Sequence, residues 1–141
     1  MSTLERAIEI AARAHAGQVD KAGSPYILHP IRLMLVVKTP HERMAAVLHD
    51  VVEDTEVTLE DLRAEGFPDE VVIAIDALTK RTGETRLDAA ARAAKNKVAI
   101  RVKLADVSDN MDMSRIPDPT EKDFVRLREY EQVKQLLLSA I

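Results

Sequence analysis

The stretch VLHDVVEDT, residues 47–55, decides how the rest of the chain is interpreted, because it places four ionisable side chains within an apolar helical pattern. These side chains are His49, Asp50, Glu53 and Asp54. An ionisable group on a face that should be buried costs on the order of several kcal/mol unless it is paired or bound to a metal. Their concentration here therefore indicates a functional site.

The spacing of the four residues suggests two tiers. On a helix, His49 and Asp50 diverge by about 100°, so both can flank a metal in the groove beside that helix. Imidazole nitrogen and carboxylate oxygen suit manganese, iron or zinc. Glu53 and Asp54 follow one turn later at i+4 and could orient or deprotonate a water. For this second tier alone, a solvated acidic helix end is an equally good interpretation.

Two further residues are candidate ligands. His29 precedes Pro30, which favours an extended backbone and directs the imidazole away from the following helix, although a hydrogen-bonded loop histidine fits the pattern as well. Asp106 follows the apolar segment 102–105, with Asp109 and Asn110 on the same helical side at i+3 and i+4. That context predicts a buried, engaged carboxylate at Asp106.

Helical spacing dominates the whole chain, so the predicted fold class is all-α. No segment shows sustained period-2 alternation, and no internal repeat is present. Of the remaining histidines, His15 is expected to pack at a helix end and His41 to lie in solvent. The predicted helices span residues 2–16, 30–38, 41–53, 58–66, 68–79, 87–94, 96–113 and 120–140.

Length and composition exclude several classes of protein. A chain of 141 residues predicts one domain, residues 1–141, and the absence of cysteine excludes disulfides. With no signal pattern and no apolar run near the roughly 18 residues of a membrane span, we expect a soluble cytoplasmic protein. A net charge of -4 and 3% aromatic residues argue against nucleic-acid binding. No pattern specifies an oligomeric state.

Three motifs give a resemblance to a known family. The segments HAGQVDKAGSPYILHP (residues 15–30), LHDVVEDT (48–55) and VKLAD (102–106), followed by Asn110, are similar in order and spacing to the HD-type hydrolase domain of RelA/SpoT homologues and small alarmone hydrolases. The resemblance extends over about residues 4–136. It implies an HD-domain bundle of about seven to eight helices.

The resemblance also implies roles for individual residues. The metal ligands would be His29, His49, Asp50 and Asp106, a set that usually holds manganese. Glu53 and Asp54 would be the acid/base pair, and Asn110 would lie near the nucleotide. In such a site the metal activates a water and offsets charge on phosphorus. Basic residues must offset the charge of the substrate, and the motif segments offer Lys21, Arg32 and Lys103, although each could equally be a solvated rim residue.

The chain departs from the family at positions that contact the nucleotide. Asp20 stands where an arginine usually packs on guanine, and a carboxylate makes no cation–π contact and repels phosphate. Val107 and Asp109 replace an arginine and a histidine of the third motif, and Arg86 lies where a tyrosine is common. These departures favour a metal centre more strongly than they favour guanosine tetraphosphate as its substrate.

The sequence thus predicts a metal-dependent phosphohydrolase that acts on a nucleotide or another small phosphorylated metabolite. Two alternatives stay open. One is a nucleotide-sensing module that binds without turnover. The other is a helical interaction protein with a fortuitous cluster of charges.

Overall fold

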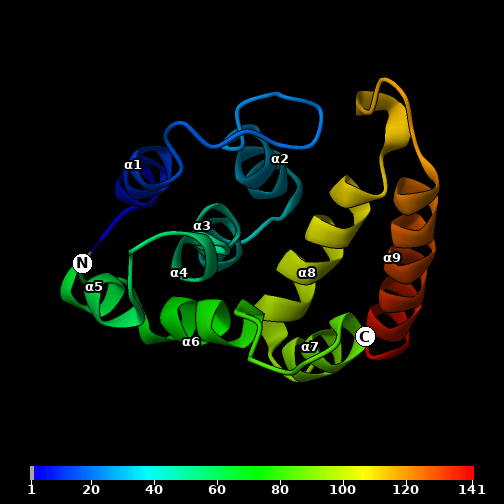
Figure 1. Ribbon diagram of the computed structural model, residues 1–141. Helices are drawn as coiled ribbons and strands as arrows, with labels where there is room; N and C mark the ends of the chain where they lie inside the picture. Colours follow the sequence, from blue (N-terminus) through cyan, green and yellow to red (C-terminus); the bar gives the residue numbers. More distant parts are fainter. Residues whose placement is uncertain (1) are drawn as a thin grey trace.

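The computed structural model describes residues 2–141 and confirms the all-α class, since no strand occurs within these residues (Figure 1). A single isolated bridge joins Val19 and Pro25. The helices are α1 (Leu4–Ala14), α2 (Leu28–Val36), α3 (Pro40–Leu48), α4 (Val51–Asp54), α5 (Leu59–Ala64), α6 (Asp69–Leu78), α7 (Arg86–Ala93), α8 (Lys97–Asn110), the 3₁₀ helix η1 (Met113–Arg115) and α9 (Glu121–Ser139).

Threonine caps set where several helices begin. The side chains of Thr39, Thr58 and Thr85 each accept a hydrogen bond from the backbone N–H three residues on. The acidic side chain at that later position accepts a hydrogen bond from the threonine N–H. This reciprocal capping box satisfies two backbone donors that the first helical turn leaves unpaired. Local sequence therefore fixes the starts of α3, α5 and α7.

Helix α3 lies at the centre of the molecule, where it packs against α1, α2, α6 and α8 (Figure 1). Its last turn, residues 45–48, is completely buried. Because Ala45 and Ala46 are small, neighbouring helices can approach α3 closely, while Val47 and Leu48 fill the core. The residue that follows, His49, is consequently delivered into the interior.

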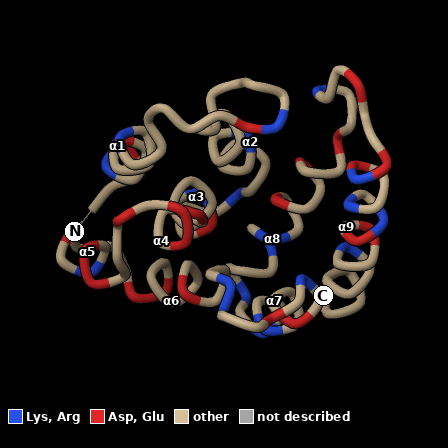
Figure 2. The backbone as a smooth tube through the Cα atoms, in the orientation of Figure 1, with Lys and Arg blue, Asp and Glu red and all other residues tan. Residues whose placement is uncertain are grey.

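A second apolar cluster attaches the C-terminal helix. Ile100 and Val107 of α8 meet Val133 and Leu137 of α9, with Ala90 of α7 completing the contact. Acidic and basic side chains alternate along α9, whereas the charged residues of α4 are all acidic (Figure 2). Thus α9 forms one wall of the molecule beside α8.

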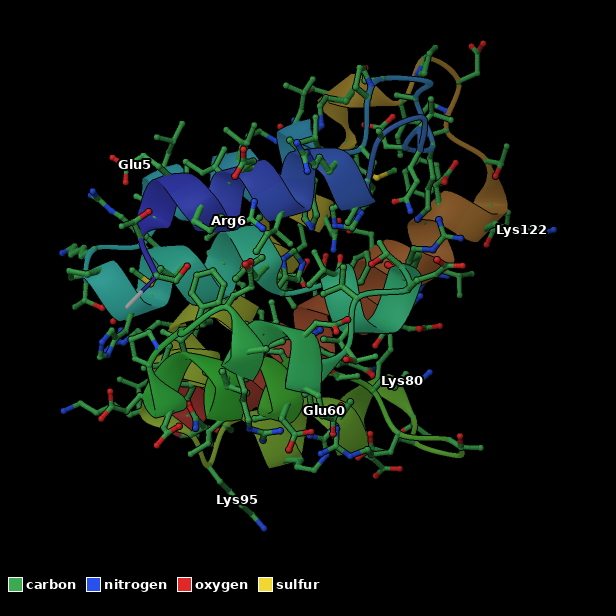
Figure 3. The ribbon with its side chains drawn as sticks, turned by 90° about the vertical axis from the view of Figure 1, so that its left-hand side faces the viewer. Glu5, Arg6, Glu60, Lys80, Lys95 and Lys122 are labelled. Atoms are coloured by element: carbon green, nitrogen blue, oxygen red, sulfur yellow. The ribbon has the colours of Figure 1, made fainter. Side chains whose placement is uncertain are left out.

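An ion pair on the opposite side ties α1 to the end of α5. Arg6 donates from Nη2 to Oε2 of Glu65 at 2.7 Å and from Nε to the same carboxylate. Arg6 lies on the face of α1 seen in Figure 3, above the labelled Glu60. Because both partners are partly exposed, at 37% and 29%, we expect this pair to add little to stability.

The predicted helix 41–53 is wrong in one respect, because the chain forms two helices there. The carbonyl of Ala46 accepts from the backbone N–H of His49 at 3.4 Å and from its ring Nδ1 at 2.7 Å, which interrupts the helical ladder. His49 and Asp50 therefore occupy a break between α3 and α4. The break divides one predicted helix into two. Within residues 2–141 the structure has nine α-helices and one 3₁₀ helix, against the seven or eight helices predicted.

Two predicted boundaries also shift. Helix α2 begins at Leu28, so His29 lies in its first turn and not before it; Pro30 is tolerated there because first-turn N–H groups need no helical partner. Helix α8 ends at Asn110, three residues earlier than predicted, and η1 follows.

We expect Leu62→Ala to lower the free energy of unfolding by about 2–5 kcal/mol, because Leu62 of α5 is fully buried and its loss leaves a cavity. Urea denaturation followed by circular dichroism would measure the change. Leu35→Ala is the matched control, since Leu35 is 71% exposed and should change stability by less than about 0.5 kcal/mol. Equal effects of the two substitutions would contradict this account of the core.

Candidate metal centre

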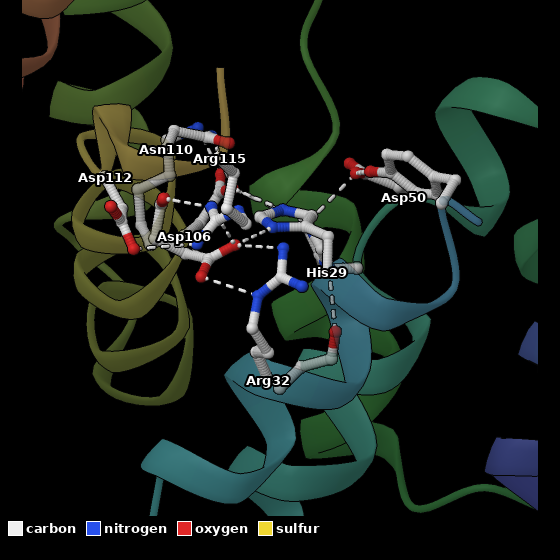
Figure 4. Close-up of polar contacts among 12 residues, drawn as sticks. His29, Arg32, Asp50, Asp106, Asn110, Asp112 and Arg115 are labelled. Carbon is white, nitrogen blue, oxygen red and sulfur yellow. Dashed lines mark hydrogen bonds and ion pairs between the residues drawn. The ribbon is translucent and has the colours of Figure 1, made fainter. Parts of the chain in front are cut away.

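The structure brings together the four predicted metal ligands, which come from α2, the α3–α4 break and α8 (Figure 4). His29 Nε2 lies 3.0 Å from Asp106 Oδ1, and His49 Nε2 lies 3.0 Å from Asp50 Oδ2 and 3.8 Å from Asp106 Oδ1. One atom each of His29, His49 and Asp50 falls within 4.8 Å of the others. His29, His49 and Asp106 are buried, and Asp50 is half-buried. The cluster thus has the separation expected of ligands around one ion.

The His49 ring shows that this cluster suits a cation. Its Nδ1 donates to the carbonyl of Ala46 at 2.7 Å, so in the neutral ring Nε2 carries the lone pair. That buried Nε2 has no hydrogen-bond partner among the described residues, although it faces the carboxylates of Asp50 and Asp106. A lone pair facing carboxylates is repulsive unless a positive charge lies between them. The donor set of two imidazoles and two carboxylates therefore fits a divalent metal ion.

The pKa values of the clustered residues also show that the site attracts positive charge. Burial lowers the pKa of His49, but the charge of Asp50, its hydrogen bond and the charge of Asp106 outweigh it and raise that pKa to about 9, so either a proton on Nε2 or a metal ion can supply the positive charge that these carboxylates attract. Burial raises the pKa of Asp106, yet the neighbouring charge of Lys103 holds it well below its usual range. Burial likewise raises the pKa of Asp50, and the charge of His49 reverses the shift. Both carboxylates are therefore ionised and able to bind a metal.

The loop 15–27 supports the cluster through Tyr26. The sequence analysis did not identify this residue, although it lies in the first of the three motifs. The Tyr26 hydroxyl donates to Oδ2 of Asp50, and its ring lies 4.9 Å from that of His15. Gln18 joins His15 Nδ1, at 2.8 Å, to the backbone carbonyl of Asp54, at 3.3 Å. This chain of contacts connects the loop to both tiers of the site.

The predicted acid/base pair lies on α4, beside the ligands. Glu53 Oε1 accepts from the backbone N–H of Lys80 at 2.8 Å, which holds the carboxylate in place. Burial, together with the charges of Asp50 and Glu53, raises the pKa of Asp54 to about 6. A carboxylate with a pKa near neutrality can both accept and release a proton under physiological conditions. Carboxylate oxygens of Asp50, Glu53 and Asp54 also lie within 4.8 Å of one another.

A cavity of about 540 Å³ opens over the cluster, and it is lined by every one of the predicted site residues. The predicted substrate-binding residues occupy its walls in different states. Lys103 pairs with Asp106 at 3.2 Å, and Asn110 Nδ2 donates to the same carboxylate at 3.0 Å. Arg32 directs Nε and one Nη to Asp109, at 2.8 and 3.0 Å. These three side chains are therefore already engaged by acidic residues.

Lys21 and Lys80 differ from the other cationic residues of the wall, because neither has an ion pair among residues 2–141. Partial burial and the charges of Arg126 and Arg86 lower the pKa of Lys21. Arg86 itself lies over the Tyr130 ring at 4.9 Å and bonds Glu129 at 2.6 Å. The cavity wall thus gathers Lys21 of the loop, Lys80 and Arg86 of α7, a convergence that the separate segments did not predict.

Asp20 also lines the cavity, where it has a structural role that the sequence did not predict. Its Oδ1 accepts from the backbone N–H groups of Ala22 at 2.9 Å and Ser24 at 3.0 Å. The loop that carries Lys21 is therefore folded around this carboxylate. Asp20 stabilises the loop conformation while adding negative charge to the cavity wall.

The chain is similar in sequence to several curated bacterial proteins. It is 39% identical over 122 residues to a Streptomyces coelicolor protein named GTP pyrophosphokinase, covering 77% of this chain and 14% of that protein. It is 34% identical over 125 residues to a Vibrio cholerae guanosine-3′,5′-bis(diphosphate) 3′-pyrophosphohydrolase, covering 79% of this chain and 18% of the relative. The chain thus spans less than a fifth of the length of these curated relatives.

The fold comparison agrees. A solved structure described as a metazoan ortholog of SpoT that hydrolyzes ppGpp matches with a TM-score of 0.78 and 26% identity, over 99% of this chain and 85% of that one. Among the described residues, no helix combines the length and apolarity needed to cross a bilayer. The family model described as HD domain matches residues 7–111. The chain belongs to the HD domain family.

Proposed function

We propose that the chain is a divalent-metal-dependent phosphohydrolase that removes pyrophosphate from the 3′-oxygen of a guanosine nucleotide or a closely similar phosphorylated metabolite. The observation that carries this proposal is the convergence of two imidazoles and two carboxylates beneath a cavity whose wall also carries Lys21, Lys80 and Arg86. The relatives named for this hydrolysis, and the hydrolase of similar fold, support the reaction type. A cytoplasmic location, where such nucleotides occur, belongs to the same proposal.

His29, His49, Asp50 and Asp106 would hold the ion, and we propose manganese because the resemblance to alarmone hydrolases implies it and because carboxylate oxygens suit this ion. A bound ion would lower the pKa of a water and offset negative charge that develops on phosphorus. Tyr26 would keep Asp50 oriented through its hydroxyl. The metal site is thus built from residues whose positions depend on three helices and one loop.

The remaining chemistry falls to the α4 tier. The water oxygen forms a bond to phosphorus while the bond between phosphorus and the 3′-oxygen breaks. Asp54, with its pKa near 6, accepts the proton of the water, and Glu53, fixed by the Lys80 N–H, orients that water. The proton then passes to the departing 3′-oxygen, which completes the balance.

The cationic side chains of the cavity wall would bind the phosphates that do not react. Of Lys21 and Lys80, the two wall cations without an acidic partner among residues 2–141, we propose Lys21, which lies in the first motif segment. Arg32, Lys103 and Asn110 would contribute less directly, since each already bonds Asp109 or Asp106. Lys21→Ala is expected to raise KM about tenfold or more with a smaller change in kcat, which steady-state kinetics would separate. An unchanged KM would remove Lys21 from the binding site.

Asp20 predicts weak selection for guanine, because a carboxylate at this position provides no cation–π contact with the base. We expect kcat/KM for guanosine tetraphosphate and for its adenosine counterpart to differ by less than about tenfold, which corresponds to about 1.4 kcal/mol. Parallel assays of the two nucleotides would measure the ratio. A preference for guanosine well above tenfold would contradict this prediction.

The experiment that tests the function is a pyrophosphate-release assay with purified protein, manganese chloride and guanosine tetraphosphate, extended to other nucleotides. Release that depends on manganese and is lost in Glu53→Gln or Asp54→Asn supports the hydrolase. Binding of a nucleotide without release of phosphate or pyrophosphate would favour the sensing module instead. The carboxylate tier favours the enzyme, since binding alone requires no group with the raised pKa of Asp54.

A further inference from the structure

We infer that Asp109 is a positioning residue for the metal centre, which holds His29 in the tautomer that presents Nε2 to the ion. This inference rests on the metal site proposed above and assigns a role to a residue that the motifs leave without one. Asp109 lies on α8, three residues after Asp106, so both carboxylates lie on the same side of that helix. The imidazole of His29 lies between them.

The two nitrogens of His29 face different carboxylates. Nε2 lies 3.0 Å from Asp106 Oδ1, within the ligand cluster (Figure 4), whereas Nδ1 lies 2.6 Å from Asp109 Oδ2. A carboxylate on Nδ1 retains the proton there, so Nε2 is left with its lone pair toward the cluster. Metal-bound histidines commonly donate their second N–H to a carboxylate in this way, which fixes the ring and increases the basicity of the ligating nitrogen.

Asp109 is itself held in place by two guanidinium groups. Arg32 of α2 donates to both of its oxygens, at 2.8 and 3.0 Å, and Arg115 of η1 lies 3.4 Å from Oδ2 and donates to the Asp109 carbonyl at 2.8 Å. The side chain of Asp109 is only 13% exposed. The carboxylate is therefore charged and has a single orientation.

This arrangement explains why Arg32 and Asp109 occur together in the chain. Arg32 follows His29 by one helical step of three residues, so the two side chains lie on the same face of α2 and reach one carboxylate on α8. A fork of two parallel N–H donors onto a carboxylate is specific to arginine. Arg32 thus acts on the metal centre through Asp109, and its contribution to substrate binding is limited to the Nη that remains.

Titration with Mn²⁺ alone, followed by isothermal calorimetry, tests the inference. Asp109→Asn keeps the size of the side chain and should weaken Mn²⁺ binding about 10- to 100-fold, the usual effect of losing an outer carboxylate partner. Asp112→Asn is the matched control, because Asp112 pairs with Arg115 at 2.9 Å and has no contact with His29. This control should bind Mn²⁺ within about twofold of the unmodified protein.

Each outcome has a defined meaning. If the unmodified protein binds no Mn²⁺, the proposed function fails at the level of the metal site. If it binds Mn²⁺ and Asp109→Asn binds equally well, or if both variants weaken binding equally, only the role of Asp109 is overturned.

A second measurement needs no variant and remains decisive if Asp109→Asn does not fold. Nuclear magnetic resonance of the Zn²⁺-loaded protein, which is diamagnetic, should show a slowly exchanging proton on Nδ1 of His29, shifted downfield by its short bond to the carboxylate. Assignment of the Zn²⁺-bound nitrogen to Nδ1, with the proton on Nε2, would overturn the inference.

Discussion

Substitution of His49 by alanine is expected to remove stoichiometric Mn²⁺ binding and with it all metal-dependent turnover. The side chain is 3% exposed and supplies an Nε2 that faces two carboxylates without a hydrogen-bond partner among the described residues. Loss of a direct ligand should weaken Mn²⁺ binding by more than about 100-fold, beyond the 10- to 100-fold effect of a residue that only orients a ligand. Calorimetric titration with Mn²⁺ and metal analysis of the purified protein would measure both affinity and stoichiometry.

His41→Ala is the control for this substitution. His41 lies at the start of α3, the helix that ends beside His49, but its side chain is 40% exposed and contacts only Glu70, at 3.3 Å. It should bind one equivalent of Mn²⁺ with unchanged affinity. His49→Gln, which fills more of the same volume, separates ligand loss from a packing defect. Retention of full affinity in His49→Gln would exclude His49 from the metal site.

Amide substitutions of Glu53 and Asp54 on α4 should have the opposite effect: Mn²⁺ binding is retained and turnover is lost. Glu53→Gln keeps the Oε1 acceptor for the Lys80 N–H, and Asp54→Asn leaves the backbone carbonyl that binds Gln18 unchanged. Each variant therefore alters charge and basicity while preserving the local contacts. We expect kcat to fall about 10²- to 10⁴-fold in at least one of them, the range for loss of a general acid or base.

Glu56→Gln is the matched control in this segment. Glu56 follows Asp54 by two residues and is exposed, and it does not line the cavity. Its kcat should remain within about twofold of the unmodified protein. Unchanged kcat in both Glu53→Gln and Asp54→Asn would show that the acid/base assignment is wrong, whereas parallel loss of Mn²⁺ would assign these carboxylates to the metal.

Local sequence was sufficient for the helices and insufficient for their interruptions. Caps such as Thr58 and Thr85 act through bonds to residues three positions away, so the boundaries that they set are legible in the sequence. The break at His49 has a different cause. Its ring Nδ1 donates a hydrogen bond to the Ala46 carbonyl, and its Nε2 lies in the interior near Asp106. Helical periodicity predicts a continuous helix there, because the spacing of apolar residues does not reveal a hydrogen bond between a side chain and the backbone.

The same distinction between local and tertiary information applies to the candidate site. The sequence by itself determined the all-α class and the chemical identity of the candidate ligands, because motif spacing and residue type are local properties. Only the tertiary structure decided that His29 lies between Asp106 and Asp109, 77 and 80 residues away, and that Arg32 is already bonded to a carboxylate. Such pairings depend on how α2 packs against α8, and packing geometry arises from the apolar core as a whole. The polar partners of each functional residue therefore become visible only after the helices have been placed.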